Sequence, residues 1–339
     1  MRKTLGCMLL VGATLTGTSL AGAGTAVASG YDQHPLADEV VTELVAEGFE
    51  ADAVRAVLAK AERKQSILDA ISRPAERRLT WGEYRKIFVE PRRIKQGVAF
   101  WNKHADALQR AEETYGVPAE IIVSIIGVET RYGRIMGRYR VLDALTTLGF
   151  DYPKRADFFR GQLVEFMRMS REEQLDPTQP IGSYAGAMGY GQFIPSSFRD
   201  FAVDFDGDGK RDIWKNEVDA IGSVANYFSE HGWKAGEPVR SNVVINETAD
   251  PAWFNDGLKP ELTLAQWAER GITTRRDLDL QQPATLMELT MEDGDHHWFG
   301  LHNFYVITRY NHSRLYAMAV YELSQAIKDA RSAPVKQES

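Results

Sequence analysis

Apolar residues in the first third of the chain recur at steps of three and four, the spacing of amphipathic helices. The groups that show it best are Val40, Leu44 and Val45, then Val54, Val57 and Leu58, then Ile67, Leu68 and Ile71. Pro74 and Pro91 interrupt the pattern. We therefore predict an N-terminal helical region over residues 31–115.

Proline and glycine positions predict where the next helices begin and end. A helix predicted over residues 99–115 is followed by Gly116, a residue suited to the left-handed position after a helix. Pro118 then stands where a first-turn proline opens the next helix, predicted over 119 to about 132. We assign residues 116–241 to a central, mainly helical region.

The pattern changes between residues 242 and 301, where turn residues become frequent and short strands are predicted. One such strand is predicted over 286–290, and another, just beyond this region, over 304–308. Helical spacing resumes over 315–327, so residues 302–331 are expected to return to the helical body. The fold class predicted is mainly α (α+β), with a small mixed α/β insert.

The first 28 residues have the features of a secretory signal peptide. Arg2 and Lys3 precede an apolar stretch over 8–20, and small residues lead to a cleavage position after Ala28. The stretch is shorter than the roughly 20 apolar residues of a membrane span. Cys7 precedes it, whereas a lipoprotein cysteine follows the apolar run. We expect export by a cleavable signal, and no thiol in the mature chain.

The amino-acid composition indicates a globular protein and argues against nucleic-acid binding. The chain of 339 residues is 44% hydrophobic and 26% charged, as ordinary globular proteins are. Its formal net charge of −7 argues against a general nucleic-acid binder, because such proteins need a basic surface to displace counterions.

Glu129 is the first candidate for chemistry. It follows Ile125 by four residues and Ile122 by seven, so it continues an apolar helical stripe. Burial there raises the pKa of a carboxyl group, as a general acid requires. The spacing leaves a second interpretation open, in which Glu129 ends the helix and pairs with Arg131 or Arg134.

Two motifs carry a family resemblance. They are GVETRYGR at 127–134 and SYAGAMGYGQFIPSS at 183–197. Further matching segments are Phe100-Trp101-Asn102, 220–228 and 307–313. Together they closely resemble the membrane-bound lytic murein transglycosylase B family, over nearly all of the mature chain.

The resemblance implies a lysozyme-like catalytic core over 116–241 and one catalytic glutamate, Glu129, without a carboxylate partner. This glutamate would protonate the glycosidic oxygen between N-acetylmuramic acid and N-acetylglucosamine. It would then take the proton of the muramic acid 6-hydroxyl, closing a 1,6-anhydro ring. The alternatives are a hydrolytic muramidase, which normally uses a second carboxylate, and a non-catalytic peptidoglycan-binding protein.

The same resemblance nominates substrate-binding residues. Gly186, Gly189 and Gly191 favour backbone close to a ligand, and the Gln192 amide both donates and accepts hydrogen bonds, although a packed loop has the same composition. The residues implied by the resemblance are Ser183, Gln192, Phe193, Tyr227, Asn311 and Tyr316, with Tyr316 near Glu129. Lys154 and Arg155 match a basic pair suited to stem-peptide carboxylates, and a solvated pair is the alternative.

A calcium-binding loop is the second strong motif. In DFDGDGKRD, Asp204, Asp206 and Asp208 occupy loop positions 1, 3 and 5, and Lys210 offers a backbone carbonyl at position 7. Lys215 stands where a standard EF-hand has its glutamate. The resemblance implies a longer, EF-hand-like loop over 204–219, closed by Asp219 or by Glu217. An acidic turn without metal is the alternative.

The remaining expectations concern partners and location. We expect no cofactor for catalysis and a structural Ca²⁺, with peptidoglycan glycan strands as the partner. Other cell-wall enzymes are further candidate partners, nucleic acid is not, and the chain is expected to be a monomer. The signal predicts a periplasmic location, with membrane association left open.

Overall fold

The computed structural model describes residues 30–73, 79–246 and 249–333, most of them helical. The predicted signal peptide over 1–28 and Pro74 lie outside these residues. The helices are α1 (Ala37–Val45), α2 (Ala51–Ala59), α3 (Gln65–Ser72), α4 (Trp81–Phe88), α5 (Pro91–Lys103), α6 (Ala105–Tyr115), α7 (Ala119–Thr130), α8 (Val141–Asp151), α9 (Ala156–Glu172), α10 (Pro195–Phe201), α11 (Glu217–Glu230), α12 (Leu264–Glu269), α13 (His302–Tyr310) and α14 (Arg314–Ser332), with 3-10 turns η1 (Pro153–Arg155) and η2 (Pro251–Trp253).

The strands form two antiparallel sheets. They are β1 (Tyr139–Arg140), β2 (Ile181–Gly182), β3 (Arg240–Ile245), β4 (Leu262–Thr263), β5 (Ile272–Thr274), β6 (Pro283–Met291) and β7 (Gly294–Gly300). The small sheet pairs β1 with β2, and the larger has the order β4-β6-β7-β3-β5. Its central hairpin runs from Thr285 opposite Gly300 to Met291 opposite Gly294.

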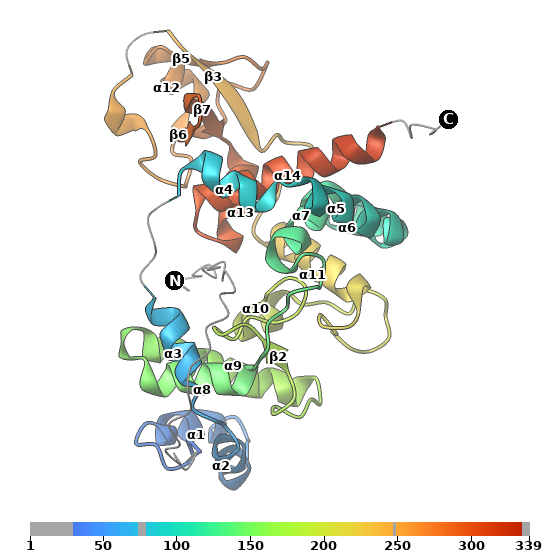
Figure 1. The fold of residues 1–339 in the computed structure, drawn as a ribbon, viewed down its shortest axis with the longest axis vertical. Helices are drawn as coiled ribbons and strands as arrows, with labels where there is room; N and C mark the ends of the chain where they lie inside the picture. Colours follow the sequence, from blue (N-terminus) through green and yellow to red (C-terminus); the bar gives the residue numbers. More distant parts are fainter. Residues whose placement is uncertain (1–29, 74–78, 247–248, 334–339) are drawn as a thin grey trace, which may run out of the picture.

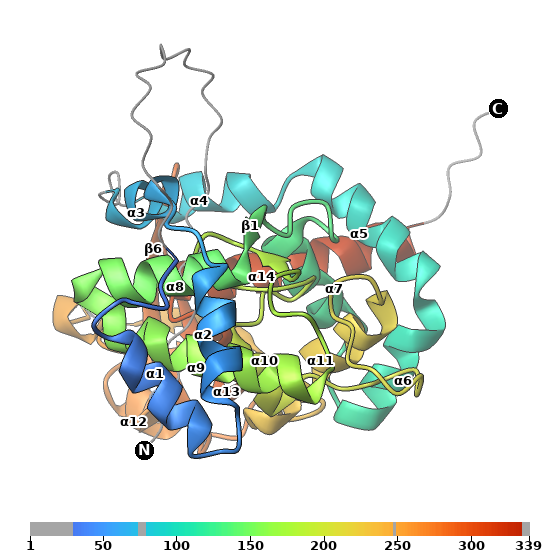
Figure 2. The ribbon, with the colours of Figure 1, turned by 90° about the horizontal axis from the view of Figure 1, so that it is seen from below.

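Figure 1 shows three groups of elements that follow one another along the long axis of the molecule. At one end α1, α2 and α3 gather around the pair formed by α8 and α9. The middle holds α4 to α7 with α13 and α14, and the five-stranded sheet with α12 forms the other end. The view from below places α1, α2 and α9 in front of α14 and α7 (Figure 2). Helices α4 and α14, which are far apart in the sequence, therefore pack against each other in the middle of the fold.

Two hydrophobic cores stabilise this arrangement. The larger core contains residues from Tyr31 to Ile327, and each of the helices α4 to α7, α13 and α14 contributes to it. The smaller lies on one face of the five-stranded sheet and is built around Trp267, Leu286 and Phe299. The opposite face, with Met287 and its neighbours, packs into the larger core. One face of the central β6–β7 hairpin thus packs on the helical body.

The predicted elements are confirmed in part. Gly116 adopts φ 70° after α6, and the strand over 286–290 lies inside β6. The helix predicted over 99–115 is wrong in extent, because the backbone bends at His104 between α5 and α6. Pro118 immediately precedes α7 and is not inside its first turn.

The strand predicted over 304–308 is wrong, because these residues lie in α13. Phe304, Ile307 and Thr308 are all buried and lie three and four residues apart, which is helical spacing. Five apolar-rich residues are too few to separate the two periods. Within the described residues, no helix is long and apolar enough to cross a membrane.

Candidate active site

Glu129 lies in the last turn of α7, a helix in which every residue is buried. Its sequence, AEIIVSIIGVET, is apolar on almost all sides, as expected of a helix covered by others. Helices α5, α6, α11 and α14 pack around it. Glu129 is only 6% exposed, so its carboxyl group has left most of the solvent.

The carboxyl group of Glu129 has one hydrogen-bond partner among the described residues. The hydroxyl of Tyr316 in α14 donates to its Oε1 over 2.5 Å, while Oε2 is buried with no partner among the described residues. Burial raises the pKa of Glu129 from its ordinary 4.5 to about 8, and the Tyr316 hydrogen bond opposes that shift. At neutral pH the group is therefore mainly protonated.

The ion-pair interpretation of Glu129 is wrong. Arg131 lies 3.7 Å from Glu90, an interaction that draws its side chain away from the buried acid. Arg134 is exposed and forms no ion pair within the described part of the chain. Among those residues, no carboxylate contributes to the pKa shift of Glu129.

A sharp turn follows Glu129. Arg131, Tyr132 and Gly133 have φ values of 50°, 60° and 80°, so three residues in succession adopt the left-handed conformation. Thr130 fixes this turn, because its Oγ1 lies 3.0 Å from the carbonyl of Tyr190 and accepts from the Gly133 amide over 3.0 Å. The loop that contains Tyr190 is thereby attached directly to the helix that carries the acid.

The glycine-rich loop combines tight backbone packing with a buried amide. Gln192 has φ 51°, and its Nε2 donates to the Gly189 carbonyl at 3.0 Å and the Met136 carbonyl at 3.4 Å. A Cβ on Gly189 would lie 2.3 Å from the carbonyl oxygen of Ile213, so only glycine fits. Ser183 is part of the turn itself, since its Oγ accepts from the Ala187 amide at 3.0 Å.

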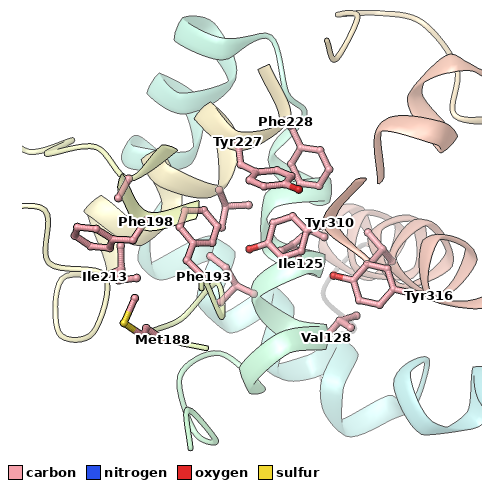
Figure 3. Close-up of a cluster of buried hydrophobic side chains, with 14 of the residues drawn as sticks. Ile125, Val128, Met188, Phe193, Phe198, Ile213, Tyr227, Phe228, Tyr310 and Tyr316 are labelled. Carbon is pink, nitrogen blue, oxygen red and sulfur yellow. The ribbon is translucent and has the colours of Figure 1, made fainter. Parts of the chain in front are cut away.

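Aromatic side chains connect this loop with Tyr316. Figure 3 shows Tyr310 between Phe193 and Tyr316, with Tyr227 beside them. Phe193 and Tyr227 are buried with ring centroids 5.8 Å apart, and the Tyr227 hydroxyl donates to the Arg309 carbonyl at 2.7 Å. Both therefore belong to the buried aromatic cluster that connects the loop with Tyr316.

The other nominated residues are more dispersed. Asn311 is buried just after α13, close in sequence to the start of α14. Lys154 is exposed and Arg155 half-buried in η1, and the Arg155 guanidinium lies over the Phe158 ring at 4.4 Å. Within the described part of the chain, no contact joins these two basic residues to the surroundings of Glu129.

Tyr84 in α4 was not anticipated from the sequence. The charge of Glu129 contributes, after burial, to raising the pKa of Tyr84 to about 12, which places Tyr84 within electrostatic reach of the acid. It precedes Glu129 by 45 residues in the N-terminal helical region, and no motif connects the two. Only the packing of α4 against α14 brings it near.

The acidic loop before α11 brings four carboxylates together. Asp204, Asp206, Asp208 and Asp219 each offer an oxygen within 4.8 Å of the others, a group of hard donors that suits a cation such as Ca²⁺. Glu217 lies outside this group, because its carboxylate contacts Lys103 at 2.9 Å.

Asp219 is fully buried and organises the acidic loop. Its Oδ1 accepts from the Phe205 amide at 2.8 Å, and its Oδ2 accepts from the Asp212 amide at 2.9 Å. Burial raises its pKa, whereas hydrogen bonding, first from Asn216, lowers the pKa of exposed Asp206. The backbone at Phe205 and at Asp212 is therefore held at the first turn of α11.

Comparison with known proteins identifies the chain. Residues 32–325 match the family model described as Transglycosylase SLT domain. The chain belongs to this family. It is 45% identical over 311 residues to membrane-bound lytic murein transglycosylase B of Escherichia coli (strain K12), with 89% of this chain and 85% of that protein covered.

Solved structures of lytic transglycosylases are also similar to this chain. Catenated lytic transglycosylase SltB1 of Pseudomonas aeruginosa matches with a TM-score of 0.87 and 55% identity over 89% of this chain and all of that one. Escherichia coli SLT35 in complex with calcium matches with a TM-score of 0.82 and 46% identity, covering 90% and 97%. SltB3 of Pseudomonas aeruginosa in complex with NAG-NAM-pentapeptide matches with a TM-score of 0.77 and 32% identity, covering 88% and 81%.

These findings confirm the predicted family and the mainly α, lysozyme-like fold. They also confirm that the chain is an enzyme of the lytic transglycosylase class, which degrades peptidoglycan.

Proposed function

We propose that this chain cleaves the β-1,4 bond between N-acetylmuramic acid and N-acetylglucosamine, with Glu129 as general acid and then general base. The observation that carries this is the buried Glu129 carboxyl group, whose pKa burial raises to about 8 and whose hydrogen-bond partner is Tyr316. A two-carboxylate hydrolase would place a second acid across the site. Among the described residues, no carboxylate contributes to the pKa shift of Glu129, and this supports a mechanism with one acid.

The proposed reaction returns Glu129 to its starting state. Glu129 gives its proton to the glycosidic oxygen as the bond from that oxygen to C1 of muramic acid breaks. The 6-hydroxyl oxygen then bonds to C1, and its proton passes to the Glu129 carboxylate. The Tyr316 hydroxyl stabilises the carboxylate between the two steps, since a hydrogen bond to the charged form favours it. No water is consumed.

We assign substrate contacts around this acid. The glycine-rich loop with Ser183 and Gln192 would present backbone and amide groups to the sugars, over a wall of Phe193, Tyr227 and Asn311. Lys154 and Arg155 would meet the carboxylates of a stem peptide. The NAG-NAM-pentapeptide complex of SltB3 supports a glycan strand as the ligand of this chain.

We further propose that the 204–219 loop holds a structural Ca²⁺. Its ligands would be the carboxylates of Asp204, Asp206, Asp208 and Asp219 and the backbone carbonyl of Lys210. The calcium complex of the relative SLT35 supports this assignment. The ion would neutralise the carboxylates and fix the loop to α11, and it would take no part in proton transfer.

Residues 1–28 would direct export to the periplasm, where the substrate lies, and other cell-wall enzymes are candidate partners of a monomeric chain. We retain the proposed division into the helical region 31–115, the catalytic core 116–241, the insert 242–301 and the returning segment 302–331.

Mass spectrometry of the products released from purified peptidoglycan sacculi tests the reaction. We expect muropeptides with 1,6-anhydromuramic acid ends, which are lighter by one water than reducing ends. Mainly reducing ends would favour a hydrolytic muramidase. Tight binding to sacculi without soluble product would favour a non-catalytic binding protein.

A further inference from the structure

Arg314 connects the helical body to the five-stranded sheet. It is the first residue of α14, and its Nη2 donates to the carbonyls of Asn255 at 2.8 Å and Gly257 at 3.4 Å. Both carbonyls lie between η2 and β4, in the segment that runs along the sheet. The Arg314 side chain is half-buried, and this burial lowers the pKa of its guanidinium.

The segment that Arg314 contacts is itself fixed to β6. The Asn255 side chain donates to the Glu288 carbonyl at 2.8 Å and accepts from the Glu288 amide at 3.3 Å, as a neighbouring strand would. Its backbone amide donates to the Leu286 carbonyl at 3.0 Å. Asn255 has φ 59°, a conformation that asparagine adopts more readily than most residues. Arg314 is therefore anchored on the sheet and not on a loose loop.

The same turn of α14 carries the partner of the catalytic acid. Ser313 caps the helix by accepting from the Tyr316 amide at 3.3 Å, and the Tyr316 hydroxyl reaches Glu129. At about 100° per residue, Arg314 and Tyr316 point roughly 200° apart around the helix. One side chain of this turn therefore contacts the sheet, and the other contacts the acid.

We propose that Arg314 is a positioning residue that fixes the first turn of α14 on the sheet and so keeps the Tyr316 hydroxyl on Glu129. The five-stranded sheet then serves the catalytic centre as its support. This inference rests on the proposed function only in taking Glu129 as the acid.

A second attachment of the sheet makes the idea testable without unfolding the protein. Glu322, further along α14, pairs with Arg85 at 2.5 Å and lies 3.9 Å from Arg240 of β3. The Arg240 guanidinium also lies over the Trp298 and Tyr321 rings, at 5.2 and 5.1 Å. None of these contacts involves Arg314, so we expect them to persist when it is replaced.

Among the described residues, tyrosines from three helices interact electrostatically with Glu129. They are Tyr84 of α4, Tyr227 of α11 and Tyr316 of α14. Of these, Tyr316 donates a hydrogen bond to Glu129 and lowers its pKa. Displacement of Tyr316 should therefore raise the pKa of Glu129.

The experiment compares Arg314→Ala, Arg314→Lys, Tyr316→Phe, the double variant Arg314→Ala/Tyr316→Phe, and a control. The control is Arg270→Ala, because Arg270 stacks on Trp253 and Trp267 within the sheet region, at 5.3 Å from each ring, without contacting α14. The Glu129 pKa is measured by carbon-13 NMR of carboxyl-labelled glutamate, with Glu129→Gln to assign the signal. Turnover of sacculi and melting temperatures are measured for every variant.

We expect Arg314→Ala to raise the Glu129 pKa in the same direction as Tyr316→Phe and to lower kcat by roughly 10- to 100-fold with little change in KM. The double variant should match Tyr316→Phe alone, and Arg314→Lys should recover part of the loss. Arg270→Ala should lower the melting temperature but leave the Glu129 pKa unchanged.

An unchanged Glu129 pKa in Arg314→Ala would overturn the proposal, as would additive effects in the double variant or an equal pKa shift in Arg270→Ala. Reducing ends from the wild-type enzyme would instead contradict the proposed function. The NMR comparison would still decide the role of Arg314 in that case.

Discussion

The Tyr316 hydroxyl donates to Glu129 Oε1 over 2.5 Å, and the two residues are 187 positions apart in the chain. Among the described residues, this is the hydrogen bond that the buried Glu129 carboxyl group receives, and Oε2 has none. The acid is therefore held by one oxygen, while its second oxygen is available for proton transfer. Predictions about activity follow from this asymmetry.

Glu129→Gln should abolish turnover while binding to sacculi persists, because the amide keeps the shape of the side chain and has no transferable proton. Glu129→Asp should reduce kcat by about 100-fold or more, since one methylene withdraws the acid from hydrogen-bond reach. Turnover is measured on purified variants, and circular dichroism controls for folding. Substantial cleavage by Glu129→Gln would exclude Glu129 as the acid.

Activity should fall as the pH rises through about 8, the pKa to which burial raises Glu129. The reaction begins with the protonated acid, so kcat/KM should decline about tenfold per pH unit above that value. The measurement is a pH profile of muropeptide release under buffers of constant ionic strength. A profile that declines already above pH 5 would indicate an ordinary, solvated glutamate.

Stability supplies the control for this pH prediction. The pKa of the Glu129 carboxyl group is raised from its ordinary 4.5 to about 8 in the folded protein. Its contribution to stability is therefore full below pH 4.5 and is lost as the pH rises from there through about 8. Glu129→Gln cannot ionise. Its melting temperature should therefore exceed that of the wild-type protein above pH 8, and the difference should shrink towards pH 5.

Much of the site could be predicted because its residues lie in short motifs. The burial of Glu129 follows from its position on an apolar stripe, and the family resemblance connected it with Tyr316. Tyr84 could not be found, because it reaches the acid only through the packing of separate helices. The choice between Asp219 and Glu217 likewise needed the structure, since both occupy the first turn of α11 and only their contacts distinguish them.

Gly127→Ala should destabilise the fold by about 1–3 kcal/mol, because the added methyl group would lie 2.5 Å from the Tyr132 hydroxyl. That hydroxyl donates to the Arg93 carbonyl at 3.0 Å and fixes the turn after Glu129. Gly161→Ala is the matched control, since no atom lies within 4 Å of its added Cβ in α9. It should be neutral or stabilise by up to about 1 kcal/mol. Equal denaturation midpoints for the two variants would contradict the proposed steric restriction.

Chelation of calcium should lower the melting temperature of the wild-type protein, because four carboxylates gathered within 4.8 Å repel one another unless a cation neutralises them. A ligand that binds only the folded state adds about 2.7 kcal/mol at 100 times its dissociation constant. Asp206→Ala or Asp208→Ala should abolish the response to added Ca²⁺, since both side chains are exposed and belong to the acidic group. Melting curves with Ca²⁺ and with chelator, together with metal analysis, measure the effect.

The contacts of Asp219 and Glu217 decide how the closing ligand is tested. Asp219→Ala should destabilise the protein even in chelator, because its carboxylate also accepts from the amides of Phe205 and Asp212. The loss of metal response, and not the loss of stability, is therefore the informative quantity for this variant. Glu217→Gln is the control, because Glu217 contacts Lys103 and lies outside the acidic group, so it should keep the full calcium response. If Glu217→Gln lost that response while Asp219→Ala kept it, Glu217 would be the closing ligand. Superimposable wild-type curves with and without metal would refute the calcium site itself.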